Sequence, residues 1–580
     1  MVHLLYLLYN DKGAEMYNNC LKVVYSHGNN GKHIVHEFNE PGVFNDCELE
    51  IIKSENSSTY IIRFPDGVTL HHVSIKKHYN FSKTSRVFCN GYQSWSVSRE
   101  YEIDEKSENL TLLGHLINKH YSLDRYNGQD KIKAKGKKGN FLSYTYTYIK
   151  EDKNSSNIML LGSLSERSGF TIYQHDANKN AIVIEKDCEG LENVNKYMFS
   201  LYEDEGGYDG VFDRYFDNCR QKKTGSAIRS SYLDGIDRKY KGFTTWYNYY
   251  QDISQRKVQK NLYYYTEKNP SCDIFQIDDG YQSFVGDWLD VNIDKFPTGM
   301  KKIASKISGK NVMPGLWLAP FSAEKDSKLF KEHPDWIVKD AKGKPYKAGS
   351  NWSGFYALDI DNRNVKNYLE IVFDTVIKEW GFTFLKLDFL YSACILPRNN
   401  KTRGQLMCEA MDFINDICKD AILLGCGVPL GPAFWNVDFC RIGADISLEW
   451  DNKRYMQLAV RERVSTRNSV VNSVFRKHLD RRVFLNDPDV FMIRSENCYM
   501  EYTQKYILGN INSAYGSLLF TSDEVEEYDE QQDELLYQII KGMPKASKEY
   551  VENKCLVMEF SDKKIIIPLE NNKKPVLTYL

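Results

Sequence analysis

Two aspartates follow apolar, strand-like segments, and a cation precedes each of them on the same predicted strand face. Side chains alternate between the two faces of a strand, so Lys386 and Asp388 point one way and Phe389 the other. Arg441 and Asp445 share a face in the same manner. A buried carboxylate is costly unless a partner or a reaction compensates. Glycoside hydrolysis requires an acid on each side of the anomeric carbon, so the pair predicts a two-carboxylate glycosidase.

The two acids need different protonation states. Nearby Lys386 favours the ionised form of Asp388, which suits a nucleophile. Burial can keep the other acid, Asp445, protonated near neutral pH. Arg441 is four residues from Asp445, so we expect it to lie further off and contact a hydroxyl. Either pair could instead be a buried salt bridge, but a purely structural barrel interior favours branched apolar side chains.

A second acidic feature follows another strand-like segment. Asp278 shares a strand face with Gln276, and Asp279 follows directly. Adjacent carboxylates repel, so both stay ionised only where donors surround them, and sugar hydroxyls or a metal ion are the candidates. No histidine follows at ligand spacing and no H-E-x-x-H occurs, so the sequence favours neither a metal nor a cofactor.

Aromatic residues and a tight turn follow other strands. Trp317 has the small neighbours Gly315 and Ala319 on its face, which leaves room for the indole in a site or in the core. Residues 243–250 end a strand with several aromatic side chains. The Gly/Pro turn at 425–432 could bring Cys426 close to a ligand.

Three regions must position these residues. Before about residue 225, β-branched and aromatic runs separated by turns predict an antiparallel β-sandwich, with a turn at 65–67 and a helix at 212–220. Residues 1–10 are apolar but lack a basic start and a cleavage site, which favours a strand over a signal peptide. From about 545, three strand-like runs predict a small sheet. We therefore expect a β-sandwich domain at 1–230, a catalytic domain at 231–543 and an antiparallel sheet at 544–580.

In the middle region the pattern of strand, loop and helix repeats. A helix is predicted near 365–380, and eight strands alternating with helices predict an α/β fold whose parallel sheet closes as a βα barrel. The expected strands are Phe243–Trp246, Ile274–Ile277, Gly315–Leu318, Phe384–Asp388, Leu423–Cys426, Phe439–Ala444, Val483–Leu485 and Ser517–Phe520.

Composition excludes several classes of protein. The net charge of −2 gives no support for nucleic-acid or anionic-membrane binding. No segment approaches the roughly 20 apolar residues of a membrane span. Thirteen cysteines, an odd number without a C-x-x-C pair, favour reduced thiols in the cytoplasm. The aromatic share of 13% is typical either of a carbohydrate site or of a β-rich fold.

These motifs together resemble the α-galactosidases of glycoside hydrolase family 36. The resemblance is firm over about 240–490 and thinner in the N-terminal part, where residues 90–96 (Asn-Gly-Tyr-Gln-Ser-Trp-Ser) are similar to a segment of that family. The motifs that carry it are Asp278-Asp279-Gly280, Trp317-Leu-Ala-Pro, Lys386-Leu-Asp388 and Cys426 followed by Arg441-x-x-x-Asp445.

The resemblance implies an N-terminal β-supersandwich, a central eight-stranded βα barrel, a C-terminal β-sheet and a metal-independent retaining mechanism on terminal α-galactosides. It implies that Asp388 is the nucleophile, and that Asp445 protonates the leaving oxygen and then activates water. The implied substrate-binding residues are Asp278 and Asp279 at the hydroxyls of C4 and C6, Lys386, Cys426 and Arg441 near C2 to C4, and Trp246, Trp317 and Trp95 against the sugar.

The chain departs from the commoner family pattern. Its turn Cys426-Gly-Val-Pro-Leu-Gly-Pro replaces a Ser-Gly-Gly-Gly-rich turn, as in a shorter-chain bacterial branch, and the chain lacks the length of the larger oligomeric members. The leading expectation is hydrolysis of melibiose- or raffinose-type oligosaccharides, with the oligomeric state open. Transfer of α-galactose, hydrolysis of α-N-acetylgalactosaminides and non-catalytic galactoside binding remain as alternatives.

Overall fold

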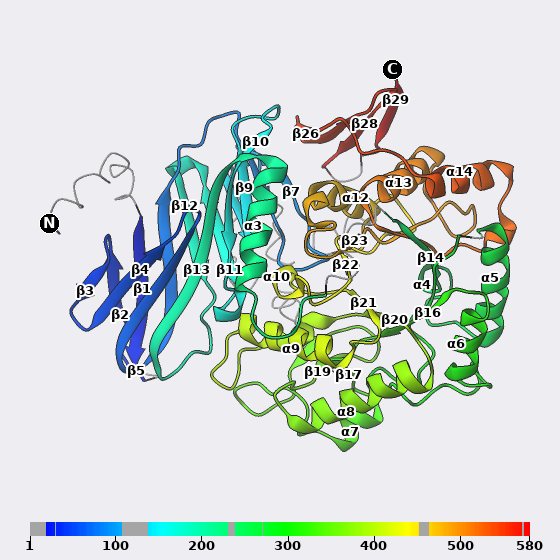
Figure 1. Ribbon diagram of the computed structural model, residues 1–580, viewed down its shortest axis with the longest axis horizontal. Coiled ribbons are helices and arrows are strands. Elements are labelled where there is room, and N and C mark those ends of the chain that lie inside the picture. Colours follow the sequence, from blue (N-terminus) through cyan, green and yellow to red (C-terminus); the bar gives the residue numbers. More distant parts are fainter. Residues whose placement is uncertain are drawn as a thin grey trace.

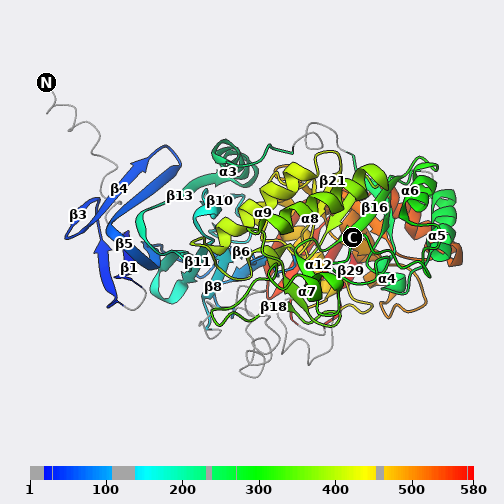
Figure 2. The same ribbon diagram turned by 90° about the horizontal axis from the view of Figure 1, so that it is seen from below.

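The computed structural model describes residues 19–28, 31–106, 137–229, 238–269, 271–451, 463–570 and 573–580. An N-terminal antiparallel sheet and a larger α/β unit lie side by side along the long axis of the molecule (Figure 1, Figure 2). A small C-terminal sheet lies next to the α/β unit (Figure 1). The strand predicted at residues 1–10 lies outside the described residues.

The N-terminal sheet is antiparallel throughout, and its main path runs β7-β6-β9-β10-β13-β5-β12-β11-β8. Its strands are β1 (Cys20–His27), β2 (Ile34–Phe38), β3 (Gly42–Phe44), β4 (Cys47–Lys53), β5 (Ser57–His78), β6 (Arg86–Cys89), β7 (Arg99–Glu102), β8 (Asn140–Tyr144), β9 (Tyr146–Lys150), β10 (Asn157–Ser163), β11 (Thr171–Asp176), β12 (Ala181–Lys186) and β13 (Val194–Gly207).

The sheet folds over an apolar core to which distant strands contribute, including Val87 of β6, Phe141 of β8 and Tyr173 of β11. The turn predicted at 65–67 is wrong, because β5 continues through it. Gly67 has a φ of +54° there, and the pairing register with β13 shifts at the same level. The chain therefore bulges instead of reversing: between Arg63 and Val68, β5 has several residues opposite the single residue that separates Val194 from Lys196. Helix α3 (Tyr208–Lys222) follows the sheet and confirms the predicted helix.

The α/β unit contains a parallel sheet in the order β23-β22-β21-β20-β16-β15-β14-β25-β24. Its strands overlap all eight predicted ones. They are β14 (Tyr240–Thr244), β15 (Ile274–Ile277), β16 (Met313–Leu318), β20 (Phe384–Leu387), β21 (Ile422–Gly425), β22 (Phe439–Arg441), β23 (Leu485–Asp487), β24 (Val490–Phe491) and β25 (Leu518–Thr521). The two strands that end this order, β23 and β24, are separated by only two residues of the chain.

Helices connect these strands, as parallel pairing requires. They are α4 (Trp246–Tyr249), α5 (Gln255–Lys268), α6 (Met300–Ser308), α7 (Lys328–Glu332), α8 (Arg363–Asp374), α9 (Arg403–Ile417), α10 (Leu430–Ala433), α12 (Thr466–Phe475), α13 (Tyr502–Tyr515) and α14 (Glu530–Lys541). Side-chain caps fix several starts; for example, the Thr402 hydroxyl accepts a hydrogen bond from the backbone amide of Gln405 at the start of α9. The helix predicted near 365–380 is confirmed by α8 and the π-helical turn Thr375–Glu379 that continues it.

Two small antiparallel sheets complete the fold. Strands β17 (Ser322–Glu324), β18 (Lys347–Gly349) and β19 (Phe355–Ala357) form a sheet within the connection from β16 to α8. The C-terminal sheet has four strands, β26 (Lys548–Glu552), β27 (Cys555–Glu559), β28 (Lys563–Pro568) and β29 (Val576–Tyr579). The sequence predicted only the last three, because Lys548–Glu552 mixes charged and apolar residues.

The described part of the chain contains no helix with the length and apolarity that crossing a membrane requires. All thirteen cysteines fall within it, and none forms a disulfide.

Candidate active site

The predicted acids meet where neighbouring parallel strands end. Strand β15 pairs with β16, and β16 pairs with β20 so that Trp317 lies opposite Lys386. Asp278 follows β15 directly, and Asp388 follows β20. Because the carboxyl ends of parallel strands share one edge, residues far apart in sequence converge there.

Asp388 is held by two neutral donors. The indole N–H of Trp317 donates to its Oδ2 at 3.0 Å, and the backbone N–H of Phe389 donates to its Oδ1 at 2.9 Å. Both donors stabilise an ionised carboxylate and fix its rotamer. The side chain is buried but not sealed, with 8% of its surface exposed.

Lys386 forms its ion pair with Asp278 rather than with Asp388; its Nζ donates to Asp278 Oδ2 at 2.9 Å. Burial lowers the pKa of this ammonium, but the charges of Asp278 and Asp388 outweigh burial and raise it. Lys386 therefore stays charged beside both carboxylates. Lys386 is thus close enough to Asp388 for their charges to interact, but its ion pair is with Asp278.

The adjacent acids Asp278 and Asp279 are separated by their partners. Besides Lys386, Asp278 accepts a hydrogen bond from Gln276 at 2.7 Å. Asp279 accepts hydrogen bonds from the side-chain amides of Gln251 and Gln282 and from the indole N–H of Trp352. Burial is the largest influence on Asp279 and raises its pKa, against the effect of these donors. We expected sugar hydroxyls or a metal ion to surround these two carboxylates. The protein itself supplies several of their hydrogen-bond donors.

Arg441 contacts Asp445 directly, which overturns the expectation that it lies further off. Strand β22 ends at Arg441, and its guanidinium donates to Asp445 Oδ1 at 2.7 Å from Nη1. The loop after β22, not a continued strand, brings the two side chains together. Burial is the largest influence on Asp445 and raises its pKa; Asp388 adds to this, while Arg441 and Lys386 oppose it. A carboxyl with a raised pKa is what a general acid requires.

The strand pattern also failed at Phe389. Strand β20 ends at Leu387, and Phe389 has a φ of +51°, in the left-handed region. The ring therefore turns towards the same edge of the sheet as Asp388, where it lies 5.3 Å from Trp95 and 5.2 Å from Trp352 between ring centroids.

The N-terminal sheet domain contributes Trp95 to this edge, as expected. Its indole N–H donates to Cys426 Sγ at 3.2 Å. The Gly/Pro turn does produce a close approach, because a Cβ at Gly427 would lie 2.8 Å from the Trp95 ring, and Gly427 has a φ of +58°. Burial, and next the charge of Asp388, raise the pKa of the Cys426 thiol, so it stays protonated in the middle of the site.

The two tryptophans predicted on the barrel differ in position. Trp317 contacts Asp388, and its ring lies 6.1 Å from that of Trp352. Trp246 opens α4 and lies 5.2 Å from the ring of Tyr250. The contact that links α4 to the acids comes from the next residue, Tyr247, whose hydroxyl donates to Asp489.

Sequence reasoning missed several residues of this site. Trp352 donates to Asp279 Oδ2 at 2.8 Å, Gln251 to the same oxygen at 2.9 Å, and Gln282 to Oδ1 at 2.6 Å. They come from loops, where no periodicity marks them. Asp489 had a signal, because Asp-Pro-Asp follows a predicted strand, but that motif alone is weak. Among the described residues, no group of three or more His, Cys, Asp or Glu side chains is arranged to hold a metal ion.

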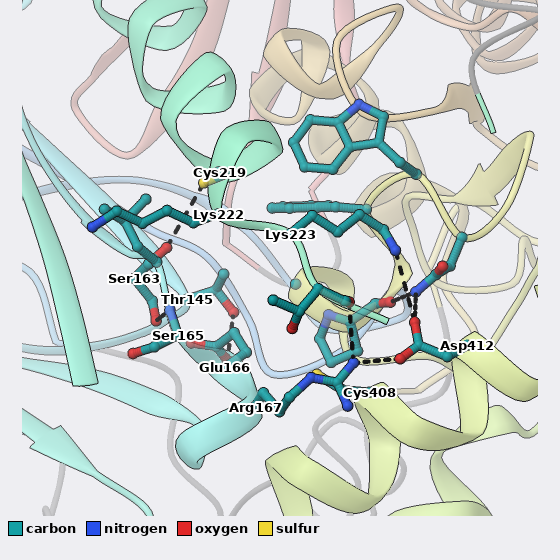
Figure 3. A pocket seen from close by; sticks show the side chains of 17 residues that line it. Thr145, Ser163, Ser165, Glu166, Arg167, Cys219, Lys222, Lys223, Cys408 and Asp412 are labelled. Carbon is teal, nitrogen blue, oxygen red and sulfur yellow. Dashed lines mark hydrogen bonds and ion pairs between the residues drawn. The ribbon is translucent and has the colours of Figure 1, made fainter. Parts of the chain in front are cut away.

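A separate cleft of about 110 Å³ lies at the junction of the N-terminal sheet with α9 and α10 (Figure 3). No predicted site residue lines it. Two of its charged groups pair with each other, Arg167 with Asp412, and the Thr145 hydroxyl donates to Glu166. This cleft is a junction between domains, distinct from the edge where the acids converge.

Part of the chain resembles known proteins in sequence. Residues 198–405 match the family model described as Melibiase. An A type blood alpha-D-galactosamine galactosaminidase of Flavonifractor plautii is 28% identical over 174 residues, which are 26% of this chain and 16% of that protein. The alpha-galactosidase AgaA of Geobacillus stearothermophilus is 24% identical over 195 residues, 32% of this chain and 25% of that protein. The matched regions thus span a quarter or less of these relatives.

Solved structures match nearly the whole chain. TtGalA, an alpha-galactosidase from Thermus thermophilus, superposes with a TM-score of 0.66 at 20% identity, covering 91% of this chain and 98% of that one. The GH36 alpha-galactosidase AgaA from Geobacillus stearothermophilus gives 0.57 at 11% identity, covering 95% and 82%. Residues 198–405 are therefore similar to the melibiase family, and the chain shares its fold with α-galactosidases of known structure.

Proposed function

We propose that this protein is a retaining exo-α-galactosidase that hydrolyses terminal α-galactosides of the melibiose and raffinose type. The observation that carries the proposal is the unequal pair of acids. Asp388 accepts two neutral hydrogen bonds, whereas burial and the charge of Asp388 raise the pKa of Asp445. Structural neighbours in complex with stachyose and with raffinose support this substrate class.

In the proposed mechanism, Asp388 attacks the anomeric carbon while Asp445 protonates the leaving oxygen. Asp445, now ionised, removes a proton from water, which attacks the glycosyl–Asp388 ester and restores both acids with retained configuration. This double displacement requires carboxyl groups about 5–5.5 Å apart. Asp278 and Asp279 accept hydrogen bonds from sugar hydroxyls, and Trp317 and Trp95 border the pyranose.

The architecture in this proposal is an eight-stranded barrel in which β23 and β24 form one interrupted strand. Support comes from Ser517, directly before β25, whose backbone N–H donates to the Asn486 carbonyl of β23 at 2.9 Å. The proposed domains are the β-supersandwich at 1–230, the barrel at 231–543 and the sheet at 544–580. Thirteen cysteines, none of which forms a disulfide, support a reducing, cytoplasmic location.

The first test is the stereochemistry of the product. Proton NMR of the sugar first released from a nitrophenyl α-galactoside should show the α-anomer before mutarotation. Release of the β-anomer would refute the retaining mechanism, and the absence of any release would refute the activity.

Variants then assign the roles. Asp388→Asn should lower kcat about 10³-fold or more on every α-galactoside, because no glycosyl ester can form. Asp445→Asn should lose far more activity on raffinose than on the nitrophenyl substrate, whose leaving group needs no proton. Asp374→Asn, at an exposed ion pair with Lys378, is the matched control and should keep full activity. Equal losses on both substrates in the Asp445 variant would contradict its role as the acid.

A second candidate is the release of α-linked galactosamine derivatives, which the Flavonifractor relative favours. Rates on nitrophenyl α-galactoside and α-N-acetylgalactosaminide separate the two. Product analysis with added sugar acceptors separates hydrolysis from transfer.

A further inference from the structure

Arg441 is shared by three carboxylates, only one of which opens to the site. Its Nη1 lies 2.7 Å from Asp445, its Nε 3.1 Å from Asp487 and its Nη2 2.9 Å from Asp489. The side chain of Asp445 is 38% exposed, whereas those of Asp487 and Asp489 are 3% and 1% exposed. One buried cation thus faces more negative charge than it can neutralise.

Asp489 is held rigidly on the far side of this arginine. The Tyr247 hydroxyl donates a hydrogen bond to its Oδ2, and the backbone N–H of Ile446 donates to the same oxygen at 2.9 Å. Because Ile446 directly follows Asp445, Asp489 is tied to the backbone of the proposed acid as well as to its arginine. Removing this anchor would loosen both.

The backbone at Asp489 is strained. Its φ is +76°, a conformation that residues with a Cβ rarely adopt. The surrounding structure fixes it: the side-chain amide of Asn512 donates to the Asp489 carbonyl, and the Ser469 hydroxyl donates to the carbonyl of Pro488. Strain of this kind persists where surrounding contacts over-determine a conformation, and it is concentrated at functional sites.

We infer that Asp489 is a positioning residue, which engages Arg441 from behind and so sets the pH range in which Asp445 can hold the proton that it gives to the leaving group. This inference rests on the proposed function. An Arg441 with no other partner would act fully on Asp445 and favour its ionised form. By occupying the same guanidinium, and by its own charge, Asp489 makes ionisation of Asp445 less favourable.

The charged surroundings are consistent with this direction. Burial raises the pKa of Asp489 to about 6, Arg441 opposes this and Asp445 adds to it. Asp489 is thus ionised near neutral pH, where its charge is needed. The groups that face Asp445 or Asp489 are Arg441, Lys386, Asp388, Asp487, Tyr247 and Cys426.

The test is the pH dependence of kcat/KM for methyl α-galactoside, whose leaving group needs protonation. The basic limb reports loss of the Asp445 proton. In Asp489→Asn, the charge of Arg441 is no longer shared with Asp489, so Arg441 stabilises ionised Asp445 more strongly. The basic limb should therefore move to lower pH by about 1 unit. Asp438→Asn is the matched control, since Asp438 is another buried aspartate with an arginine partner, Arg229 at 2.8 Å, and its basic limb should stay in place.

A second variant covers the event that Asp489→Asn does not fold. Tyr247→Phe removes one donor from Asp489, which favours its protonated form, and should move the basic limb in the same direction by a smaller amount. An unmoved basic limb in the folded variants overturns the inference, and so does an equal shift in Asp438→Asn.

A direct titration separates this inference from the proposed function. Carbon NMR of protein labelled at the aspartate carboxyls, with the Asp445 signal assigned by its loss in Asp445→Asn, reports protonation without any substrate. If no α-galactoside is hydrolysed, the proposed function fails, yet a lower titration midpoint of Asp445 in Asp489→Asn still supports the positioning role. An unchanged midpoint refutes that role whether or not the enzyme is active.

Discussion

At the scale of single residues, the carboxylates of this site differ in what surrounds them rather than in what they are. Asp388 accepts only neutral donors, Asp278 has the ammonium of Lys386, and Asp445 shares Arg441 with two other acids. Asp279 is surrounded by side-chain amides and an indole, and its burial raises its pKa. Four chemically equal groups thus have different charged and neutral partners, which is the basis for proposing different roles for them.

The indole of Trp352 is one of the hydrogen-bond donors to Asp279. Trp352→Phe keeps an aromatic ring against Trp317 and Phe389 but removes the N–H that donates to Asp279 at 2.8 Å. A hydrogen bond to a charged group contributes about 1.5–3 kcal/mol, so kcat/KM on an α-galactoside should fall about 10- to 100-fold.

The control is Trp336→Phe, which alters a tryptophan stacked on His333. Its kcat/KM should stay within about twofold of the wild type. Full activity in a folded Trp352→Phe protein would show that the indole donor does not matter to Asp279.

At the scale of elements, the function depends on where strands stop. β20 ends one residue before Asp388 and β22 ends at Arg441, so short loops rather than pleated backbone aim the acids. Because Phe389 adopts a left-handed conformation, its ring points towards the site. In an extended strand the same ring would point away from the site. The N-terminal sheet also contains buried polar side chains, among them His175 on β11.

His175 lies on β11, is 2% exposed, and contacts the Thr147 hydroxyl at 3.0 Å through Nε2. Burial lowers the pKa of His175 to about 3 in the folded protein, against about 6.5 in the unfolded chain. Below pH 6.5 the unfolded chain therefore binds a proton that the folded protein rejects. The stability from neutral His175 is complete above pH 6.5 and is lost progressively as the pH falls towards 3.

Denaturant unfolding at pH 7.5 and pH 5.5 measures this linkage. The wild type should lose about 1.4 kcal/mol more of its unfolding free energy between these pH values than His175→Gln does. The same loss in both proteins would show that His175 titrates alike in the folded and unfolded states.

At the scale of the whole molecule, both the N-terminal sheet and the α/β unit contribute residues to the edge where the acids lie. The loop that carries Trp95 is fixed to the α/β unit by Arg476, which is fully buried at the end of α12. Its guanidinium donates to the carbonyls of Gln93 and Ser94 and to the side chain of Asn90. The N-terminal sheet is therefore a part of the site, since one of its loops closes the edge where the acids lie.

Arg476→Lys tests this coupling. A lysine cannot replace the several directed hydrogen bonds, and buried carbonyls lose their partner, so the unfolding free energy should fall by about 3–5 kcal/mol. Activity should fall as well, because Trp95 loses its support.

Arg482→Lys is the control at the same domain junction. Its side chain is 21% exposed and pairs with Asp209 and Asp213 of α3, and such exposed pairs contribute about 1 kcal/mol or less. Similar destabilisation by both substitutions would contradict a special role of Arg476.

The elements were predictable because local patterns specify them. The eight parallel strands are short apolar runs between amphipathic helices, and each predicted run overlaps an observed strand. The motifs around Asp278, Lys386 and Asp388 could be recognised since they lie at or just after strand ends. The predictions failed where backbone conformation changes within one residue, at Gly67 and Phe389, because periodicity carries no information about a left-handed residue.

The sequence by itself predicted which acids could react and which strands would precede them, because apolar periodicity and charged residues at strand ends are local properties of the chain. Only the tertiary structure decided the partners: Lys386 on Asp278, Arg441 among three carboxylates, and Trp95 on Cys426. These contacts join residues from 4 to 331 positions apart in sequence. They depend on how strands and loops converge in space, which no local pattern encodes.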